Sequence, residues 1–193
     1  MVPAAMRFTR RVSGPGQFEW MDDKDNVVAT EAYERPRLLS GKSRAVLEVP
    51  STSYELRRPS DSNDPYTWMW RGLMRVRDLQ RGEEVITPSR PLGSVGWSST
   101  MVLSDGQSLR VRRTRTRRAS AHRYSFVILT NGAGKRVLCV RYIPSSSTDP
   151  FFLEARLQAL VREGCPGQLL LPLVALAGDI LTYGLKSVRW PPD

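Results

Sequence analysis

The sequence is poor in the residues on which most enzymes and metal proteins depend. His122 is the only histidine, and the two cysteines, Cys139 and Cys165, belong to no CxxC or Cys/His metal pattern. No pair of carboxylates stands in a recognisable acid–base context, and His122 has no visible partner for such chemistry. We therefore expect no catalytic residues, no metal and no cofactor, and an enzyme is the least favoured class of function.

Long hydrophobic runs are also scarce. Residues 1–11 lack the apolar segment of a signal peptide. The apolar stretch at residues 169–185 contains Asp179 and is shorter than the roughly 20 apolar residues that a membrane-spanning helix needs. We expect no transmembrane segment. Two isolated cysteines favour a reducing compartment, so we expect a cytoplasmic protein, with peripheral attachment to a membrane as an option.

Lysine is rare, and arginine carries the positive charge. Only four of the 29 basic residues are lysine, and the formal net charge is +10. Residues 101–143 contain nine arginines and Lys135 against the single acid Asp105, so this stretch holds +9 of that charge. A GC-rich genome would explain the preference for arginine but not its uneven placement. Such a clustered field attracts nucleic acid, anionic lipid headgroups or an acidic protein.

Strand-like segments separated by turns fill most of the chain. The 193 residues suit a single domain over residues 1–193, with strands in residues 7–143. Two hairpins are best marked, residues 100–104 with 108–117 around Asp105 and Gly106, and residues 122–130 with 135–142 around Asn131 and Gly132. Further candidate strands are residues 17–22, 27–32, 44–49, 54–58, 67–76 and 93–97.

The last part of the chain, residues 149–187, predicts two helices. Apolar residues recur at helical spacing at Leu153, Leu157, Leu160 and Val161. They predict an amphipathic helix over residues 149–163, with Asp149 and Pro150 at its start. A second helix over about residues 172–186 is apolar nearly all round, and such a helix must be enclosed by protein. We therefore predict a mainly β fold of many short antiparallel strands with a buried apolar C-terminal α-helix, plus one amphipathic helix.

Three segments in succession carry a resemblance to a known family. They are Tyr-Ser-Phe-Val-Ile-Leu-Thr-Asn-Gly at residues 124–132, Arg-Val-Leu-Cys-Val-Arg-Tyr at residues 136–142, and Pro-Leu-Val-Ala-Leu-Ala-Gly-Asp-Ile-Leu at residues 172–181. This order of strand, turn, strand and apolar helix resembles the tubby-like superfamily, in particular its LURP-one-related branch. Residues 18–29 look like one of its hairpins. The resemblance implies a closed barrel around a hydrophobic helix and a non-enzymatic binding module. Tubby-type domains are associated with phosphoinositide and membrane-surface binding through basic side chains.

The densest part of the basic stretch is a candidate anion site. If residues 109–117 are extended, Leu109 and Val111 share one face with alternate arginines, and the other face is polar throughout. The planar fork of arginine suits phosphate oxygens. The candidate anion-binding residues are Arg110, Arg112, Arg113, Arg115, Arg117 and Arg118. The alternative is a solvated strand end whose charge discourages edge-to-edge aggregation.

Other patterns point to ordinary structure. Residues 132–135 resemble part of a phosphate loop but lack its spacing and its helix. The aspartates at residues 22, 23 and 25 lack the glycine and closing glutamate of a calcium loop, which favours a polar turn. Four tryptophans are expected to be core or rim aromatics. They are Trp68, Trp70, Trp97 and Trp190.

The leading functional hypothesis is a non-enzymatic binding or scaffold protein that binds anionic membrane lipid headgroups through its arginine-rich strand. One alternative is a nucleic-acid-binding protein that uses the same segment. The other alternative is a subunit of a larger protein assembly, with Leu153, Leu157 and Leu160 as a stripe that faces a partner.

Overall fold

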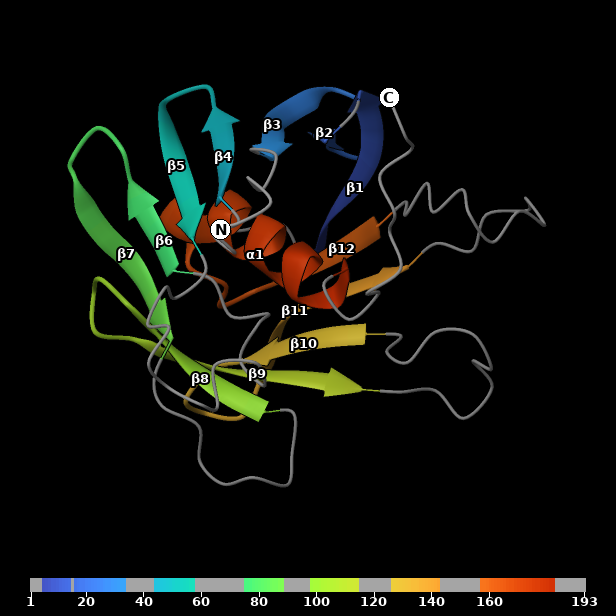
Figure 1. Ribbon diagram of the computed structural model, residues 1–193. Helices are drawn as coiled ribbons and strands as arrows, with labels where there is room; N and C mark the ends of the chain where they lie inside the picture. Colours follow the sequence, from blue (N-terminus) through green and yellow to red (C-terminus); the bar gives the residue numbers. More distant parts are fainter. Residues whose placement is uncertain are drawn as a thin grey trace, which may run out of the picture.

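Twelve strands form a closed barrel around one helix in a computed structural model of the chain (Figure 1). The structure describes residues 5–14, 16–33, 44–57, 75–88, 98–114, 126–142 and 157–182. The strands are β1 (Ala5–Gly14), β2 (Gln17–Met21), β3 (Val27–Tyr33), β4 (Arg44–Val49), β5 (Thr52–Arg57), β6 (Arg75–Asp78), β7 (Glu83–Pro88), β8 (Ser98–Leu103), β9 (Ser108–Thr114), β10 (Phe126–Thr130), β11 (Arg136–Tyr142) and β12 (Leu157–Arg162). A short 3-10 helix, η2 (Gly167–Leu169), leads into the helix α1 (Leu170–Thr182).

Each strand pairs antiparallel with its neighbour along the chain, and the barrel closes between its first and last strands. In that closing pair, Ala5 of β1 lies opposite Arg162 of β12. Turn residues fit this up-and-down path. In the β8–β9 turn, Gly106 has φ +82°, and Asp105 Oδ1 accepts a hydrogen bond from the Gln107 N–H at 2.9 Å. Closure pairs the backbone N–H and C=O groups that the edge strands of an open sheet would leave exposed.

Helix α1 lies inside the barrel, which explains why it is apolar on every side. Its residues from Leu173 to Ala177 are all fully buried, and it packs mainly against β10, β11 and β4. Gly178 lies close to the wall. A Cβ atom there would lie 3.1 Å from Leu157 Cδ1 and 3.1 Å from Trp20 Cζ2. The missing side chain therefore lets the helix sit against β2 and β12.

The predicted barrel with a buried C-terminal helix is confirmed, but the predicted amphipathic helix over residues 149–163 is wrong. Residues 149–156 lie outside the described residues, and the remainder forms the strand β12. Its burial alternates with period two, since Leu157, Ala159 and Val161 point into the barrel. The physical reason is closure, because β12 supplies the hydrogen-bonding partner that β1 and β11 would otherwise lack. Leu157 therefore cannot belong to a partner-facing stripe with Leu160.

Most predicted strands are present with ends shifted by a few residues, and the strand at residues 44–49 matches β4. The strands β1 and β7 were not predicted. The predicted strand at residues 93–97 lies outside the described residues, as does most of the one at residues 67–76, whose end belongs to β6. The barrel therefore follows from the succession of hairpins rather than from any single strand.

Candidate functional site

The arginine-rich strand is β9, and its side chains divide between the two faces of the barrel wall. Leu109 and Val111 point inward and are 1% and 3% exposed. Arg110 and Arg112 alternate with them and are exposed on the outer face. The inward leucine and valine anchor the strand, so the two arginines are held at the surface by the packing of their neighbours.

The other predicted anion-binding residues are less fully described. Arg113 continues β9 and pairs with Val127 of β10. Arg115, Arg117 and Arg118 lie outside the described residues. The structure thus places two of the six predicted residues, Arg110 and Arg112, on an exposed surface and brings them into a common strand.

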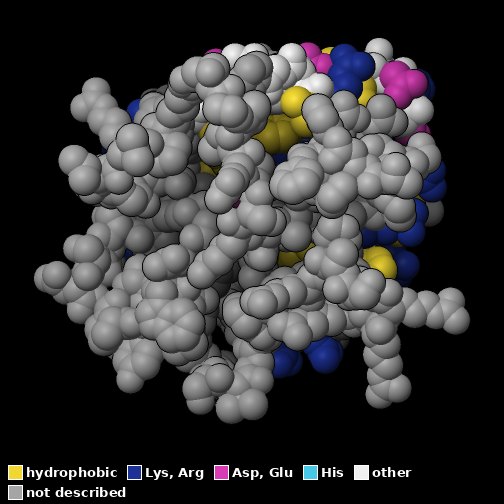
Figure 2. Space-filling view, turned by 45° about the vertical axis from the view of Figure 1, so that its right-hand side comes forward, with side chains coloured by type: hydrophobic (Ala, Val, Ile, Leu, Met, Phe, Trp, Pro, Cys, Tyr) yellow, Lys and Arg dark blue, Asp and Glu magenta, His cyan; other side chains and the backbone are white. Residues whose placement is uncertain are grey.

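Neighbouring strands add four exposed arginines to the same outer face. Two come from β11, one from β12 and one from β1. The register places Thr130 of β10 opposite Arg110 on one side and Arg136 on the other. We call this surface the basic wall, which comprises Arg7, Arg110, Arg112, Arg136, Arg141 and Arg162. In the view of Figure 2, dark blue Lys and Arg side chains lie at the right and lower margins, and a yellow hydrophobic side chain is visible beside those at the right.

Acidic residues are missing from the strands that form this half of the barrel. The six consecutive strands β8, β9, β10, β11, β12 and β1 contain no Asp or Glu. The other six strands contain seven, namely Glu19, Glu31, Glu48, Glu55, Asp78, Glu83 and Glu84. The strands of this half of the wall therefore carry an excess of positive charge, although Arg10 and Arg11 of β1 are paired with acids from other elements. Such an excess attracts polyanions.

Half-buried apolar side chains lie between the arginines of the basic wall. One row runs across five strands, since Arg112 pairs with Ile128, Ile128 with Cys139, Cys139 with Leu160, and Leu160 with Arg7. The three central side chains are half-buried. Burial raises the pKa of the Cys139 thiol, although three nearby arginines oppose the rise, so the thiol is neutral at neutral pH. The row therefore has an apolar centre with a cation at each end.

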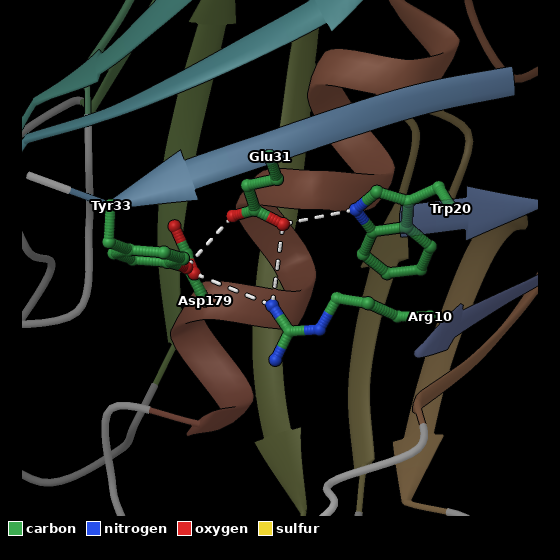
Figure 3. Close-up of polar contacts among 5 residues, drawn as sticks. All are labelled: Arg10, Trp20, Glu31, Tyr33 and Asp179. Carbon is green, nitrogen blue, oxygen red and sulfur yellow. Dashed lines mark hydrogen bonds and ion pairs between the residues drawn. The ribbon is translucent and has the colours of Figure 1, made fainter. Parts of the chain in front are cut away.

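A second polar site lies inside the barrel, where three charged residues from three elements meet (Figure 3). Arg10 of β1, Glu31 of β3 and Asp179 of α1 are 1%, 1% and 5% exposed. Arg10 Nη1 lies 3.4 Å from Glu31 Oε2 and 3.8 Å from Asp179 Oδ1. The Trp20 Nε1–H donates to Glu31 Oε2 at 3.1 Å, and the Tyr33 hydroxyl donates to Glu31 Oε1 at 2.8 Å. We call Arg10, Glu31 and Asp179 the interior triad.

Aromatic rings and burial determine the electrostatics of the interior triad. The Arg10 Cζ atom lies 4.4 Å from the centre of the Phe18 ring and 5.6 Å from that of Trp20, which are cation–π distances. Burial raises the pKa of Asp179 well above its usual value, and the charge of Glu31 adds to the rise. Burial also raises the pKa of Glu31, while Arg10 and the indole of Trp20 oppose the rise.

Sequence reasoning missed the interior triad, although a signal was present. In β1, Arg10 shares the inward face with Phe8, and in β3, Glu31 shares it with Ala29. Asp179 is the only charged residue of α1. Charged residues at three core positions of different elements suggest a buried ionic cluster, but their proximity depends on a barrel register that the sequence does not reveal.

The two weaker sequence patterns are hairpin turns. Asp22 Oδ1 accepts hydrogen bonds from the backbone N–H groups of Lys24 and Asn26, each at 2.9 Å. Asn131 Oδ1 accepts one from the Lys135 N–H at 3.0 Å. In the parts of the chain that the structure describes, no group of three or more His, Cys, Asp or Glu could hold a metal ion. The residues that lie outside those parts include His122, Trp68, Trp70, Trp97 and Trp190.

The fold class is a closed antiparallel barrel that encloses one apolar C-terminal helix, and no described helix is long and apolar enough to cross a bilayer. A protein of known X-ray structure from Arabidopsis thaliana, AT5G01750, is similar to it. The two share 15% sequence identity, with a TM-score of 0.53 over 92% of each chain. At this identity the similarity shows the fold alone. No protein-family model matches the chain, and no curated protein does.

Proposed function

We propose that the protein is a non-enzymatic binding or scaffold protein of tubby-like fold that attaches to anionic membrane lipid headgroups through its basic wall. The observation that carries this proposal is the run of six strands without an acidic residue, over which the exposed arginines are spread. The barrel around a helix and the similarity to the Arabidopsis structure support the fold, and the order of strand, turn, strand and apolar helix in the sequence is the basis for the LURP-one-related branch.

The charge of the basic wall is of the right size for reversible attachment. A basic side chain near an anionic leaflet contributes about 1 kcal/mol. Six arginines spread over neighbouring strands therefore provide several kcal/mol when the wall lies flat on the surface, and none of that attraction is cancelled by an acid on the same strands.

The apolar row favours a membrane surface over nucleic acid. Ile128, Cys139 and Leu160 lie between the arginines on a convex wall. Side chains of this kind are accommodated at the boundary between headgroups and acyl chains, while the long arginine side chains keep their charge among the phosphates. A nucleic-acid backbone would satisfy the arginines but would leave the apolar row without a partner.

Vesicle co-sedimentation tests the proposal. The double change Arg110→Ser and Arg112→Ser removes two exposed charges whose inward neighbours stay in place. We expect it to weaken binding to phosphatidylserine-containing vesicles by about 2 kcal/mol, or roughly 30-fold. Neutral phosphatidylcholine vesicles should bind neither protein.

The matched control is the double change Arg75→Ser and Arg81→Ser. It removes the same charge from exposed positions on β6 and the β6–β7 turn, outside the acid-free half of the barrel. It should leave vesicle binding within about twofold, since the lost charges do not face the lipid. Equal losses for the two variants, or equal binding to neutral vesicles, would contradict the proposal. Stronger retention on duplex DNA than on anionic vesicles, with a steep salt dependence, would favour the nucleic-acid alternative.

The proposed location follows from the same surface. The protein is cytoplasmic and attaches to the membrane peripherally, because its charge faces the anionic leaflet of the cytoplasmic side. No cofactor takes part in binding of this kind, since arginine and lipid phosphate interact directly.

A further inference from the structure

The outer face of the basic wall carries four apolar side chains that lie together. Ile128, Cys139 and Leu160 follow one another across β10, β11 and β12. Phe126 lies beside Ile128 on the same face of β10, because the buried Val127 between them points inward. All four side chains are half-buried, so each keeps part of its apolar surface in contact with water. We call Phe126, Ile128, Cys139 and Leu160 the apolar island.

Arginines of the basic wall flank the apolar island. Arg112 of β9 pairs with Ile128 on one side, and Arg7 of β1 pairs with Leu160 on the other. Three further arginines, from β11 and β12, lie near enough to Cys139 to oppose the rise in the pKa of its thiol. A ligand that covers the island must therefore offer apolar surface in the middle and negative charge at the edges.

The arginine beside Phe126 is held close to the barrel wall. Arg141 pairs with Phe126 on β10 and with Gln158 on β12. Its Nε and Nη2 atoms both donate to Gln158 Oε1, at 2.9 and 2.6 Å. The guanidinium thus lies along the wall toward the next strand, and it keeps its full charge because the amide is neutral. A phosphate bound by Arg141 would therefore lie beside the island rather than above it.

Phosphates and acyl chains lie at the same depth only in some membranes. In a tightly packed leaflet the headgroups cover the acyl chains, and the island would face hydrated headgroups without any gain. In a loosely packed leaflet, gaps between the headgroups expose acyl chains at the level of the phosphates. Contact with the island there removes two apolar surfaces from water, and the gain grows with the area covered. Binding by such a surface depends on lipid composition as well as on charge.

We propose that the apolar island makes the basic wall selective for anionic membranes whose headgroups are loosely packed. This inference rests on the proposed attachment of the wall to anionic lipid. The arginines supply attraction to any leaflet of the same surface potential. The island adds its contribution only where acyl chains are within reach, so lipid charge and lipid packing act separately on the affinity.

Two sets of vesicles with equal surface potential separate these contributions. Both contain phosphatidylserine and phosphatidylcholine, one set with unsaturated acyl chains and the other with saturated chains and cholesterol, which pack tightly. We expect the wild-type protein to co-sediment with the unsaturated set at about tenfold higher affinity. Equal affinity for the two sets would overturn the selectivity and leave the attachment by charge intact. Absence of binding to both sets would contradict the attachment itself.

The double change Ile128→Thr and Leu160→Thr removes apolar surface from the island without changing any charge, and threonine suits a strand. We expect the preference for the unsaturated set to fall below about threefold, with little change in binding to the saturated set. The matched control is Val46→Thr, at a half-buried position on the outer face of β4, and it should keep the wild-type preference. A full preference in the double variant, or an equal loss in the control, would overturn the proposal.

The same double change tests whether a second copy of the chain covers the island instead. Size-exclusion chromatography over a range of protein concentrations should show the same monomeric size for the wild type and the double variant. A wild-type dimer that dissociates on the double change would assign the island to self-association and overturn the proposal.

Discussion

At the scale of single residues, the fold depends on a few side chains whose chemistry is unusual for their position. Arg10 is almost fully buried yet keeps two carboxyls and two aromatic rings around its guanidinium. A buried ion pair contributes little net stability, but removal of one partner leaves the other uncompensated. Such residues fix how elements meet rather than how strongly the protein folds.

Replacement of Arg10 by Met should therefore destabilise the protein in a pH-dependent way. At pH 7 the loss should be about 3–5 kcal/mol, because Glu31 loses its counterion inside the barrel. The folded-state pKa of Glu31 then rises further, so Glu31 takes up a proton in acid and the loss should be smaller at about pH 5. Urea unfolding at the two pH values measures the difference. The control is Arg11→Met, at an exposed residue that pairs with Glu19 at 2.7 Å, and it should cost less than about 1 kcal/mol of stability. A loss of stability on Arg10→Met that is equal at both pH values would contradict the explanation.

Gly178 is the second residue with a specific steric role. Gly178→Ala would place a methyl group 3.1 Å from Trp20 and Leu157, both of which are fully buried. Alanine gains about 1 kcal/mol of helix propensity, but overpacking costs roughly 1–3 kcal/mol, so we expect a net loss. Gly167→Ala meets nothing within 4 Å and should be neutral or slightly stabilising. The urea midpoint of unfolding measures both variants. If the midpoint of Gly178→Ala lay above that of Gly167→Ala, the helix would have room to shift.

At the scale of elements, β12 shows how much of the fold could be predicted from the sequence. Hairpins with marked turns and an all-round apolar helix predicted many strands and a buried helix, and the resemblance to the tubby-like superfamily implied that the strands close into a barrel. The strand at residues 157–162 was not predicted, because its sequence fits two periods. Leu157, Leu160 and Val161 fit a helical period, while Leu157, Ala159 and Val161 fit a strand period. The choice depends on a vacant place between β1 and β11, which is a property of the assembled barrel.

The residues of the candidate site likewise include some that the sequence predicted and some that it did not. Arg110 and Arg112 were predicted, because the density of charge is visible in the sequence itself. The contributions of Arg7 and Arg162 were not, because those residues join the surface only when β1 and β12 pair at barrel closure. Long-range strand pairing is the information that a local pattern lacks.

Two aspartate substitutions distinguish a strand from a helix at this segment. Ala159 is fully buried, whereas Leu160 is half-buried on the outer face. Ala159→Asp should cost at least about 3 kcal/mol, because it buries an unpaired charge. Leu160→Asp should cost much less, since its carboxylate can reach water. Thermal unfolding of both variants gives the order, and a greater loss for Leu160→Asp would favour the amphipathic helix instead.

At the scale of the whole molecule, the barrel is electrically polarised. Charge that is concentrated in one part of the sequence, residues 101–143, is joined at closure by arginines from both ends of the described chain. The result is a convex wall with exposed arginines, an apolar row between them and no acid on its strands. The proposed attachment to anionic lipid requires this wall, and not the opposite one, to face the membrane.

Site-specific fluorescence measures that orientation directly. In a background with Cys139 and Cys165 replaced by Ser, an environment-sensitive probe would be attached at Thr130→Cys, between Arg110 and Arg136 on the basic wall, or at Glu48→Cys, exposed on β4. With phosphatidylserine-containing vesicles, we expect a blue shift and protection from an aqueous quencher at position 130 and no change at position 48. Three results would contradict the proposed role of the basic wall. They are a fluorescence change at position 48 alone, equal fluorescence changes at both positions, and no fluorescence change at position 130 while the protein co-sediments with the vesicles.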